Sequence, residues 1–379
     1  MNQFKILHIV TSLGDGGAEG VLTRLCTTDK KNENVVISLM APAKYSDLLI
    51  SNGITVKHLN FNRGKLTIRG LYRLYKEIKS SEADAVQTWM YHSDFFGGAL
   101  ARLAGIKNVF WNIRHSNLDI NKTKKSTIYI AKLCALFSRF IPSKIICCAE
   151  QAKQSHIGIG YYERKMIVIE NGYDLSRFHR IHVDKLSVLN EEFKSLELKV
   201  RPLIGMVGRY TPEKDHNNLL QALHLLSSKE CDFFIVLAGT GVDNDNKALL
   251  DLIEHYKLSD KVLLLGPITD IPLLMNHLDM HVLSSSSEGF PNVLAEAMAC
   301  GTPCISTKAG AAERIIGNSG WLVPTNNPEN LADAIYDAIH EFELCKEKWN
   351  ERRMIAEQRI KDNFSIEVMI DKYNEVWTN

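Results

Sequence analysis

The sequence predicts two α/β domains, each built on a doubly wound parallel sheet. The chain has 379 residues, more than the roughly 250–300 residues at which a single hydrophobic core stops growing. Short apolar runs alternate with helical patterns through both halves, as in parallel sheets whose strands are connected by helices. Hydrophobic residues make up 45% and charged residues 23% of the chain, a globular balance that excludes disordered, collagen-like and coiled-coil proteins.

The first half shows this alternation from its start. Phe4–Val10 predicts a buried strand, and the glycine-rich turn 14–17 leads into a helix expected from Ala18 to about Thr27. The first run is too short to span a bilayer, and no small-residue cleavage site follows it, so we expect a strand and not a signal peptide. Further strands are expected at Val35–Leu39, Thr55–Leu59, Ala85–Trp89, Val109–Ile113 and Lys144–Cys148, and helices at Ile68–Ile78 and Asp94–Ala104.

The second half repeats the pattern. Strands are expected at Leu203–Val207, Phe233–Leu237, Val262–Leu265, Met280–Leu283 and Pro303–Ser306, and helices at Asn217–Leu226, Asn246–Tyr256, Ile271–Leu278 and Asn292–Ala299. We place the domains at residues 1–180 and 181–362, with a hinge near Arg180–Arg201, where the charge changes and no strand is obvious. Residues 363–379 are expected to form a helix that can return to the first domain.

The two halves of the chain differ in charge, and the cysteines show no pattern of a metal site. Residues 1–180 carry 26 Lys+Arg and 14 Asp+Glu, whereas the remainder carries 19 and 30. This asymmetry predicts an anionic partner for the basic half. The eight cysteines are scattered and lack the paired spacing of a zinc site, so free buried thiols in a reducing compartment are expected.

The densest candidate site is the segment 284–296, Ser-Ser-Ser-Ser-Glu-Gly-Phe-Pro-Asn-Val-Leu-Ala-Glu. It follows the strand Met280–Leu283 and therefore lies at a strand's carboxyl end, where ligands bind in such sheets. The helix expected next would direct its first amides, around Asn292 and Val293, at an anion, because a helix amino end carries roughly half a positive charge.

Two carboxylates lie in this segment, eight residues apart. Glu288 and Glu296 are hydrogen-bond acceptors, one able to reach a sugar and the other a ribose. Acidic residues are also favoured near a helix start for purely structural reasons. The Gly-Phe-Pro-Asn sequence between them favours the binding interpretation.

The second candidate cluster is Gly-Met-Val-Gly-Arg-Tyr-Thr-Pro-Glu-Lys-Asp at 205–215. The strand ends at Val207, Gly208 allows a turn, and Arg209 and Lys214 follow at its carboxyl end. Two cations suit a diphosphate, because Arg binds it as a fork and Lys as a point charge. The alternative is that both are solvated surface residues.

These clusters resemble the donor site of retaining GT-B glycosyltransferases of family four. The family's Glu-x7-Glu element corresponds to Glu288 and Glu296, and its Gly-Arg…Lys element to Gly208, Arg209 and Lys214. Asn-Gly-Tyr-Asp at 171–174 resembles the family's Asn-Gly-[Val/Ile]-Asp segment, with a tyrosine where an aliphatic residue is usual. The resemblance covers nearly the whole chain and implies two facing Rossmann-like domains.

The resemblance also implies a role for each matching residue. Arg209, Lys214, Asn292 and Val293 would bind the donor diphosphate, while Glu288 and Phe290 would hold the sugar and Glu296 the ribose hydroxyls. Pro267 and Ile268 would contact the base through backbone atoms. Glu288 and His115 are the expected catalytic residues.

The first half would supply the acceptor side. Gly16, Gly17 and Glu19 belong to a segment that resembles the family's Gly-Gly-Ala-Glu loop. A dinucleotide fingerprint is the alternative, but Glu19 stands where its last glycine should be. His92 and Arg114 follow strand ends, with His115 next to Arg114 where related enzymes often place a histidine near the reacting sugar.

The expected reaction needs no metal and no cofactor. Charge grows on the leaving diphosphate, and Arg209, Lys214 and the helix start at Val293 can stabilise it, each such group being worth about 3–4 kcal/mol. Configuration would be retained, with a diphosphate oxygen accepting the acceptor's proton. Asp-Asn-Asp at 243–245 spells a metal motif of another fold, but helix capping explains it better here.

Basic stretches in the first half predict a membrane surface as partner. Residues 120–149 hold six Lys or Arg before the first acid at Glu150, and a second acid-free basic run spans 63–76. Such runs suit an anionic bilayer, although a solvated helix face is an equal alternative. No nucleic-acid-binding module accompanies the charge.

The leading hypothesis is therefore a transferase in surface polysaccharide biosynthesis. It would move a hexose or N-acetylhexosamine from a nucleotide sugar, expected to be a UDP-sugar, to a glycan or a polyprenyl-diphosphate-linked glycan. It would act in the cytoplasm, peripherally at the inner face of the membrane. The alternatives are a sugar-nucleotide 2-epimerase of the same fold and a non-catalytic subunit that recruits partners to the membrane.

Overall fold

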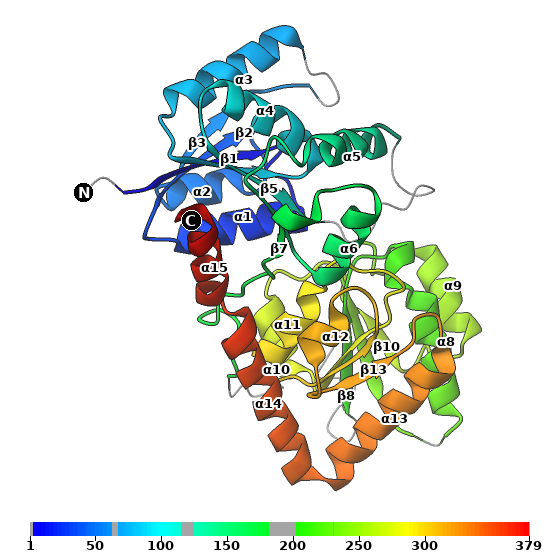
Figure 1. Cartoon of the computed structure of the whole chain (residues 1–379). Coiled ribbons are helices and arrows are strands. Elements are labelled where there is room, and N and C mark those ends of the chain that lie inside the picture. The colour runs from blue at the N-terminus through cyan, green and yellow to red at the C-terminus, as the bar shows by residue number, and fades with distance from the viewer. Residues whose placement is uncertain (1–2, 63–66, 115–124, 182–201, 230, 379) are drawn as a thin grey trace. The chain divides into compact units, whose positions relative to one another are not determined.

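The computed structural model describes residues 3–62, 67–114, 125–181, 202–229 and 231–378. The chain divides into two compact units. Unit 1 comprises Met1–Gly172 with Ile366–Asn379, and unit 2 comprises Tyr173–Ser365, compared with the boundaries at 180 and 362 placed from the sequence. Each unit has helices around one parallel sheet, as predicted (Figure 1).

The sheet of unit 1 has seven strands in the order β3-β2-β1-β4-β5-β6-β7, and every neighbouring pair is parallel. The central strand, β4, is buried along its whole length, as expected where helices cover both faces of a sheet. The strands are β1 Lys5–Val10, β2 Glu33–Ser38, β3 Thr55–His58, β4 Ala85–Trp89, β5 Asn108–Ile113, β6 Lys144–Cys147 and β7 Met166–Val168.

The helices of unit 1 include one from the far end of the chain. They are α1 Gly17–Thr28, α2 Ser46–Ser51, α3 Ile68–Ser80, α4 Gly98–Leu103, α5 Lys125–Phe137, α6 Glu150–Gly158 and α15 Ile366–Thr378, with a π-helix at Ser93–Gly97 and a 3-10 helix at Glu163–Lys165. Figure 1 shows α15 in red beside α1, which it contacts. Its residues Ile366, Met369, Ile370, Tyr373 and Trp377 are part of the core that β1 and α1 build.

The sheet of unit 2 has six parallel strands in the order β10-β9-β8-β11-β12-β13. The strands are β8 Leu203–Val207, β9 Phe234–Ala238, β10 Val262–Leu264, β11 Met280–Leu283, β12 Cys304–Thr307 and β13 Trp321–Val323. The helices are α8 His216–Ser227, α9 Lys247–His255, α10 Ile271–His277, α11 Asn292–Ala299, α12 Ala312–Ile316, α13 Pro328–Leu344 and α14 Lys346–Phe364, with a 3-10 turn at Pro212–Lys214. A separate core gathers around β8, β9, α8 and α13.

The cysteines are free thiols, and most of them are buried, as predicted. Cys345 differs, because it is exposed between α13 and α14. Across the described ranges, no helix combines the length and the apolar character required to cross a bilayer.

Candidate active site

The candidate donor residues lie in loops at the carboxyl edge of the unit 2 sheet. Parallel strands end at a common edge, so the loops after β8, β9 and β10 meet there. Backbone hydrogen bonds join them: Gly208 N donates to Ala238 O at 2.8 Å, Tyr210 N to Thr240 O at 2.9 Å, and Gly239 N to Gly266 O at 2.8 Å. The segments that hold Arg209 and Pro267–Ile268 therefore belong to one continuous backbone network.

Gly239 lets two of these loops touch backbone to backbone. Its φ of +146° lies in a region that side-chain-bearing residues rarely adopt. A Cβ atom at this position would stand 2.1 Å from the carbonyl oxygen of Gly208. The turn after β8, which presents Arg209, therefore depends on a glycine in the neighbouring loop.

A second set of contacts joins the turn after β8 to the loop after β11. Ser286 N donates to Glu213 O at 2.8 Å, and the Ser284 hydroxyl donates to the backbone oxygens of Lys214 and Asp215 at 2.9 and 3.0 Å. These bonds bring the two sequence clusters together, although 74 residues separate Lys214 from Glu288.

Lys214 and Glu288 form an ion pair at the meeting point of the two clusters. Lys214 Nζ lies 2.6 Å from Glu288 Oε1, and the Ser285 hydroxyl donates to the same oxygen at 2.7 Å. The side chains are only 19% and 14% exposed, so water screens the pair less than a surface pair. A cation and a carboxylate thus lie together in a partly enclosed place.

Two buried histidines support this edge without adding charge to it. Burial, followed by the charge of Lys214, lowers the pKa of His281 to about 3 and that of His216 to about 4. Both imidazoles are therefore neutral at neutral pH. His281 Nε2 accepts a hydrogen bond from Val207 N at 3.3 Å at the end of β8. Neither histidine could be identified from the sequence, because His281 lies inside an ordinary apolar strand and His216 in a polar helix start.

Arg209 differs from Lys214 in its surroundings. The residue is exposed at the end of β8. In the part of the chain that the structure describes, it has no hydrogen bond and no ion pair. Its guanidinium is therefore a solvent-exposed positive charge at the carboxyl edge of the unit 2 sheet.

Helix α11 begins directly after the Glu288 loop, with Pro291 at its N-cap and no side-chain cap. The cap residue thus contributes no side-chain acceptor, and the amino end of a helix favours an anion. Asn292 opens the helix, Val293 is buried, and Glu296 follows half-buried.

Phe290 and Asn292 are both tied to other parts of unit 2. The Phe290 ring is 8% exposed and packs edge-on against Phe364, with ring centroids 5.8 Å apart. Asn292 Oδ1 accepts a hydrogen bond from the Tyr173 hydroxyl at 2.5 Å. Tyr173 departs from the family pattern in the sequence, but no local pattern links it to Asn292.

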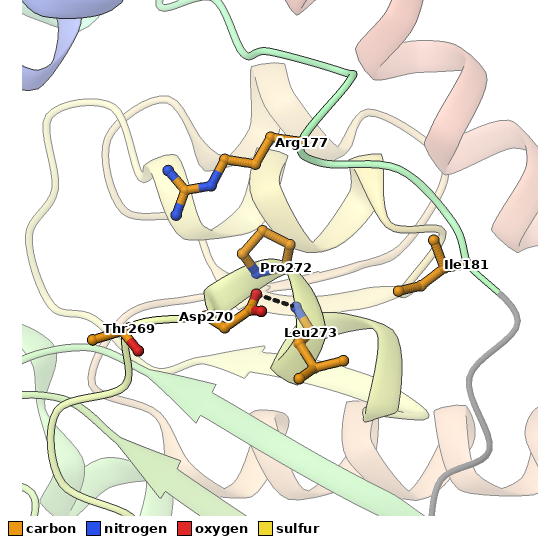
Figure 2. Close-up of a pocket in the computed structure, with 6 residues that line it drawn as sticks. All are labelled: Arg177, Ile181, Thr269, Asp270, Pro272 and Leu273. Carbon is orange, nitrogen blue, oxygen red and sulfur yellow. Dashed lines mark hydrogen bonds between the residues drawn. The ribbon is translucent and has the colours of Figure 1, made fainter. Parts of the chain in front are cut away.

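A pocket of about 470 Å³ lies near the predicted base-binding loop. Figure 2 shows it between the Arg177–Ile181 segment and the start of α10, where Asp270 accepts a hydrogen bond from Leu273 N at 3.0 Å. Thr269, one of its lining residues, directly follows the predicted base contacts Pro267 and Ile268, which are exposed and half-buried respectively.

The Asp-x-Asp triplet does not cap α9, so that expectation was wrong by one position. Asn246 is the cap, and its side chain accepts a hydrogen bond from Leu249 N at 3.2 Å. Asp243 instead accepts one from Asp245 N within the preceding turn, at 3.2 Å. Among the described residues, no three His, Cys, Asp or Glu side chains gather as metal ligands.

The acceptor-side candidates in unit 1 begin at the amino end of α1. Gly16 is the N-cap, Gly17 is the first helical residue, and Glu19 stands in the first turn. The Glu19 carboxylate folds back over the cap, since a Cβ at Gly16 would lie 2.2 Å from its Oε2. Burial raises the pKa of this carboxyl. Glu19 therefore stands at the helix start itself.

The other acceptor-side candidates follow β4 and β5. His92 is half-buried at the N-cap of the π-helix, and burial lowers its pKa. Arg114 donates to Asn171 Oδ1 at 2.6 Å and to the Tyr373 hydroxyl, and its guanidinium lies 5.4 Å from the Trp89 ring centroid. The predicted catalytic His115 lies outside the described residues.

Two family models match consecutive parts of the chain. The model of "Glycosyltransferase Family 4" matches residues 15–177, and that of "Glycosyl transferases group 1" matches residues 189–356. A UDP-Gal:α-D-GlcNAc-diphosphoundecaprenol α-1,3-galactosyltransferase of Escherichia coli is 26% identical over 82% of this chain and 79% of its own. An N,N'-diacetylbacillosaminyl-diphospho-undecaprenol α-1,3-N-acetylgalactosaminyltransferase of Campylobacter jejuni is 27% identical over 81% and 82%.

Solved structures show the same fold. HepE of Anabaena, crystallised with UDP, matches with a TM-score of 0.84 at 22% identity, over 99% of both chains. A glycosyltransferase of Rickettsia africae matches with a TM-score of 0.81 at 22% identity, over 100% of this chain and 98% of its own. With two parallel-sheet α/β units and both family models in place, the chain belongs to the group 1, family 4 glycosyltransferases and is an enzyme of the GT-B fold.

Proposed function

We propose that this glycosyltransferase moves a hexose or N-acetylhexosamine from a UDP-sugar to a polyprenyl-diphosphate-linked glycan, with retention of configuration, in surface polysaccharide biosynthesis. The observation that carries this proposal is the ion pair between Lys214, in the turn after β8, and Glu288, in the loop that leads into α11. It joins a cation for phosphate to a carboxylate for sugar hydroxyls. The names of the Escherichia coli and Campylobacter jejuni relatives, which specify diphosphoundecaprenol-linked acceptors, support the acceptor class.

The positive groups of the edge would stabilise the leaving group. As the anomeric bond breaks, negative charge grows on the diphosphate. Lys214, Arg209 and the first amides of α11 can share that charge, and preorganised donors of this kind are worth about 3–4 kcal/mol each. The diphosphate would compete with Glu288 for Lys214, and the carboxylate could then accept a hydrogen bond from a sugar hydroxyl. A diphosphate oxygen can take the acceptor's proton, as retention of configuration permits.

The same groups make a metal ion or other cofactor unnecessary in this proposal. The positive charge that a divalent cation would supply comes from Lys214, Arg209 and α11. Glu296, one turn into α11, is assigned to the ribose hydroxyls, and the backbone of Pro267 and Ile268 to the base. Activity is expected to persist after dialysis against a chelator, and a loss restored by Mg²⁺ or Mn²⁺ would contradict this part.

The test is UDP or GDP release from a panel of nucleotide sugars, with and without bacterial lipid extract. Release from one UDP-sugar that rises with extract is expected, together with a loss of at least about 100-fold in Glu288→Ala. A new epimer formed without acceptor would instead indicate the 2-epimerase. A folded protein that releases nothing from any donor would indicate a non-catalytic subunit.

We further propose that unit 1 docks on the anionic inner face of the cell membrane. Large apolar side chains along and just beyond α5 are exposed, namely Tyr129 by 65%, Leu136 by 67% and Phe140 by 70%. Basic residues accompany them: Lys132 and Arg139 are exposed on the same segment. An alternation of apolar and basic side chains suits a bilayer interface.

A cluster of cations surrounds the turn after α5. Lys165 Nζ donates to Arg139 O and Pro142 O, both at 2.6 Å, and Arg102 Nε donates to Ile141 O at 2.6 Å. The pKa of Lys165 is lowered by burial first and then by the charges of Arg102, Arg139 and Lys144. The positive field is therefore concentrated around exposed Phe140, where anionic headgroups would relieve the repulsion.

Vesicle sedimentation tests this docking. Each basic residue near an anionic surface is worth about 1 kcal/mol, so Lys132→Glu with Arg139→Glu should weaken binding to phosphatidylglycerol vesicles at least about tenfold. Lys247→Glu with Lys361→Glu makes the same charge change on exposed sites of unit 2 and should leave binding unchanged. Equal binding by all three proteins would leave the unit 1 residues as ordinary surface.

A further inference from the structure

Tyr173 makes a buried polar contact with the start of α11 through its side-chain hydroxyl. It is the first residue of unit 2 and is 1% exposed. Its hydroxyl donates to Asn292 Oδ1 at 2.5 Å, across 119 residues of sequence. The aliphatic residue usual in the family segment that 171–174 resembles has no hydrogen-bonding group. The hydroxyl of Tyr173 therefore supplies a buried polar link to the start of α11.

The tyrosine is held in place by the segment where the chain leaves unit 2. Tyr173 N donates to Phe364 O at 2.9 Å, and Tyr173 forms a parallel bridge with Ser365. Phe364 also packs against Phe290, two residues before Asn292. A buried ring with a fixed backbone has little conformational freedom left to lose, so its hydroxyl is a preorganised donor.

The hydrogen bond determines which end of the Asn292 amide can meet an anion. A carboxamide has an accepting oxygen and an NH₂ group that only donates. Because Oδ1 accepts the hydrogen bond from the Tyr173 hydroxyl, the Nδ2 group of Asn292 faces the opposite way. Diphosphate oxygens only accept hydrogen bonds, so the reverse orientation would present one acceptor to another.

We propose that Tyr173 is a positioning residue for the donor, which orients the Asn292 amide so that Nδ2 donates to the diphosphate. The inference rests on the proposed function, because it takes Asn292 as a diphosphate ligand. It assigns to Tyr173 no contact with the donor itself. Its effect must therefore pass through Asn292 and must depend on the second phosphate of the nucleotide.

Equilibrium binding of UDP and UMP to Tyr173→Phe tests the inference. The variant keeps the buried ring and removes only the hydroxyl. We expect UDP to bind about three- to tenfold more weakly, the usual range for one hydrogen bond. UMP, which lacks the second phosphate, should bind within about twofold of wild type. In steady-state assays the KM for the UDP-sugar should rise by the same factor as the Kd for UDP.

A double-mutant cycle separates positioning from a general structural effect. In Asn292→Ala, adding Tyr173→Phe should cause no further loss of UDP affinity, because the amide it orients is gone. Tyr336→Phe removes a hydroxyl from α13 of the same unit and serves as the matched control, with wild-type binding expected.

Three results would overturn the inference and leave the proposed function standing. They are unchanged UDP binding by Tyr173→Phe, an equal loss of UDP and UMP, or additive losses in the double variant. A wild-type protein that binds no nucleotide and releases none from any sugar would instead overturn the proposed function, and this inference with it.

Discussion

The carboxyl edges of the two sheets use their polar residues in opposite ways. In unit 2, loops after neighbouring strands hydrogen-bond to one another and gather Lys214, Glu288 and the start of α11. In unit 1, Asn112 and Arg114 at the end of β5 instead donate to Tyr373 of the C-terminal helix. The edge of the unit 2 sheet therefore gathers charged side chains that a ligand could contact. At the edge of the unit 1 sheet, two polar side chains instead hold α15 in place.

The largest expected effect comes from removing the Trp377 side chain, which α15 buries in the core of unit 1. Trp377 is 1% exposed in the unit 1 core, and its Nε1 donates to Gln87 Oε1 at 3.1 Å. Trp377→Ala should lower the free energy of unfolding of unit 1 by about 3–5 kcal/mol. Amide exchange followed by mass spectrometry should show lost protection in unit 1 and not in unit 2.

Trp349→Ala is the matched control for that experiment. Trp349 is 5% exposed in the core of unit 2, so its truncation should give the reverse pattern. If either variant deprotects both units equally, the two cores unfold as one cooperative body and the comparison fails.

The next effect separates the two cations of the unit 2 edge. Lys214→Met removes the partner of Glu288 and should reduce kcat/KM by about 10²–10³-fold, or about 3–4 kcal/mol. It should also lower the thermal midpoint, because a partly buried carboxylate loses its cation. Arg209→Met should reduce kcat/KM without changing the midpoint, since the exposed guanidinium has no partner among the described residues. Equal midpoints for both variants would show that the ion pair contributes nothing to stability.

A smaller effect concerns a carboxyl group buried under the unit 1 edge. Asp94 lies in the π-helix, where its Oδ1 accepts hydrogen bonds from the Thr88 hydroxyl at 2.6 Å and from Asn112 N at 3.3 Å. Burial raises its pKa to about 7. Its contribution to stability is therefore complete below the ordinary carboxyl pKa and is lost as the pH rises through 7.

Asp94→Asn keeps the accepting oxygen and removes the titration. Relative to wild type, the variant should gain up to about 2–3 kcal/mol in unfolding free energy between pH 5 and pH 8, at about 1.4 kcal/mol per unit of pKa shift. Urea unfolding at the two pH values measures this. A difference that does not change with pH would show that Asp94 does not titrate in this range.

Most helices and strands could be predicted because residues next to them in the sequence mark where they begin and end. Ala85–Trp89, Leu203–Val207 and Asn292–Ala299 were predicted at their observed bounds, each an apolar pattern ended by turn or helix-breaking residues. The strands Met166–Val168 and Trp321–Val323 were missed. Strands of three residues are too short to show an alternation of apolar and polar side chains. They are recognised only by their pairing with strands from elsewhere in the chain.

The candidate site divides in the same way. Its place at the carboxyl edge follows from motifs next to predicted strands, so Lys214 and Glu288 could be named from sequence. Their pairing could not, because it depends on hydrogen bonds between loops far apart in the chain. The links from Tyr173 to Asn292 and from Arg114 to Tyr373 likewise leave no local pattern, and the binding roles of all these residues stay predictions.

The membership of α15 in unit 1 has a consequence for synthesis on the ribosome. The core around β1 and α1 requires Ile370 and Trp377, which are translated after all of unit 2. At about 5–20 residues per second, the nascent unit 1 waits on the order of 10–40 seconds with an uncovered apolar face. Trp349, the last residue of the unit 2 core, also precedes α15 in the chain, so the unit whose synthesis begins first is the last to receive its whole core.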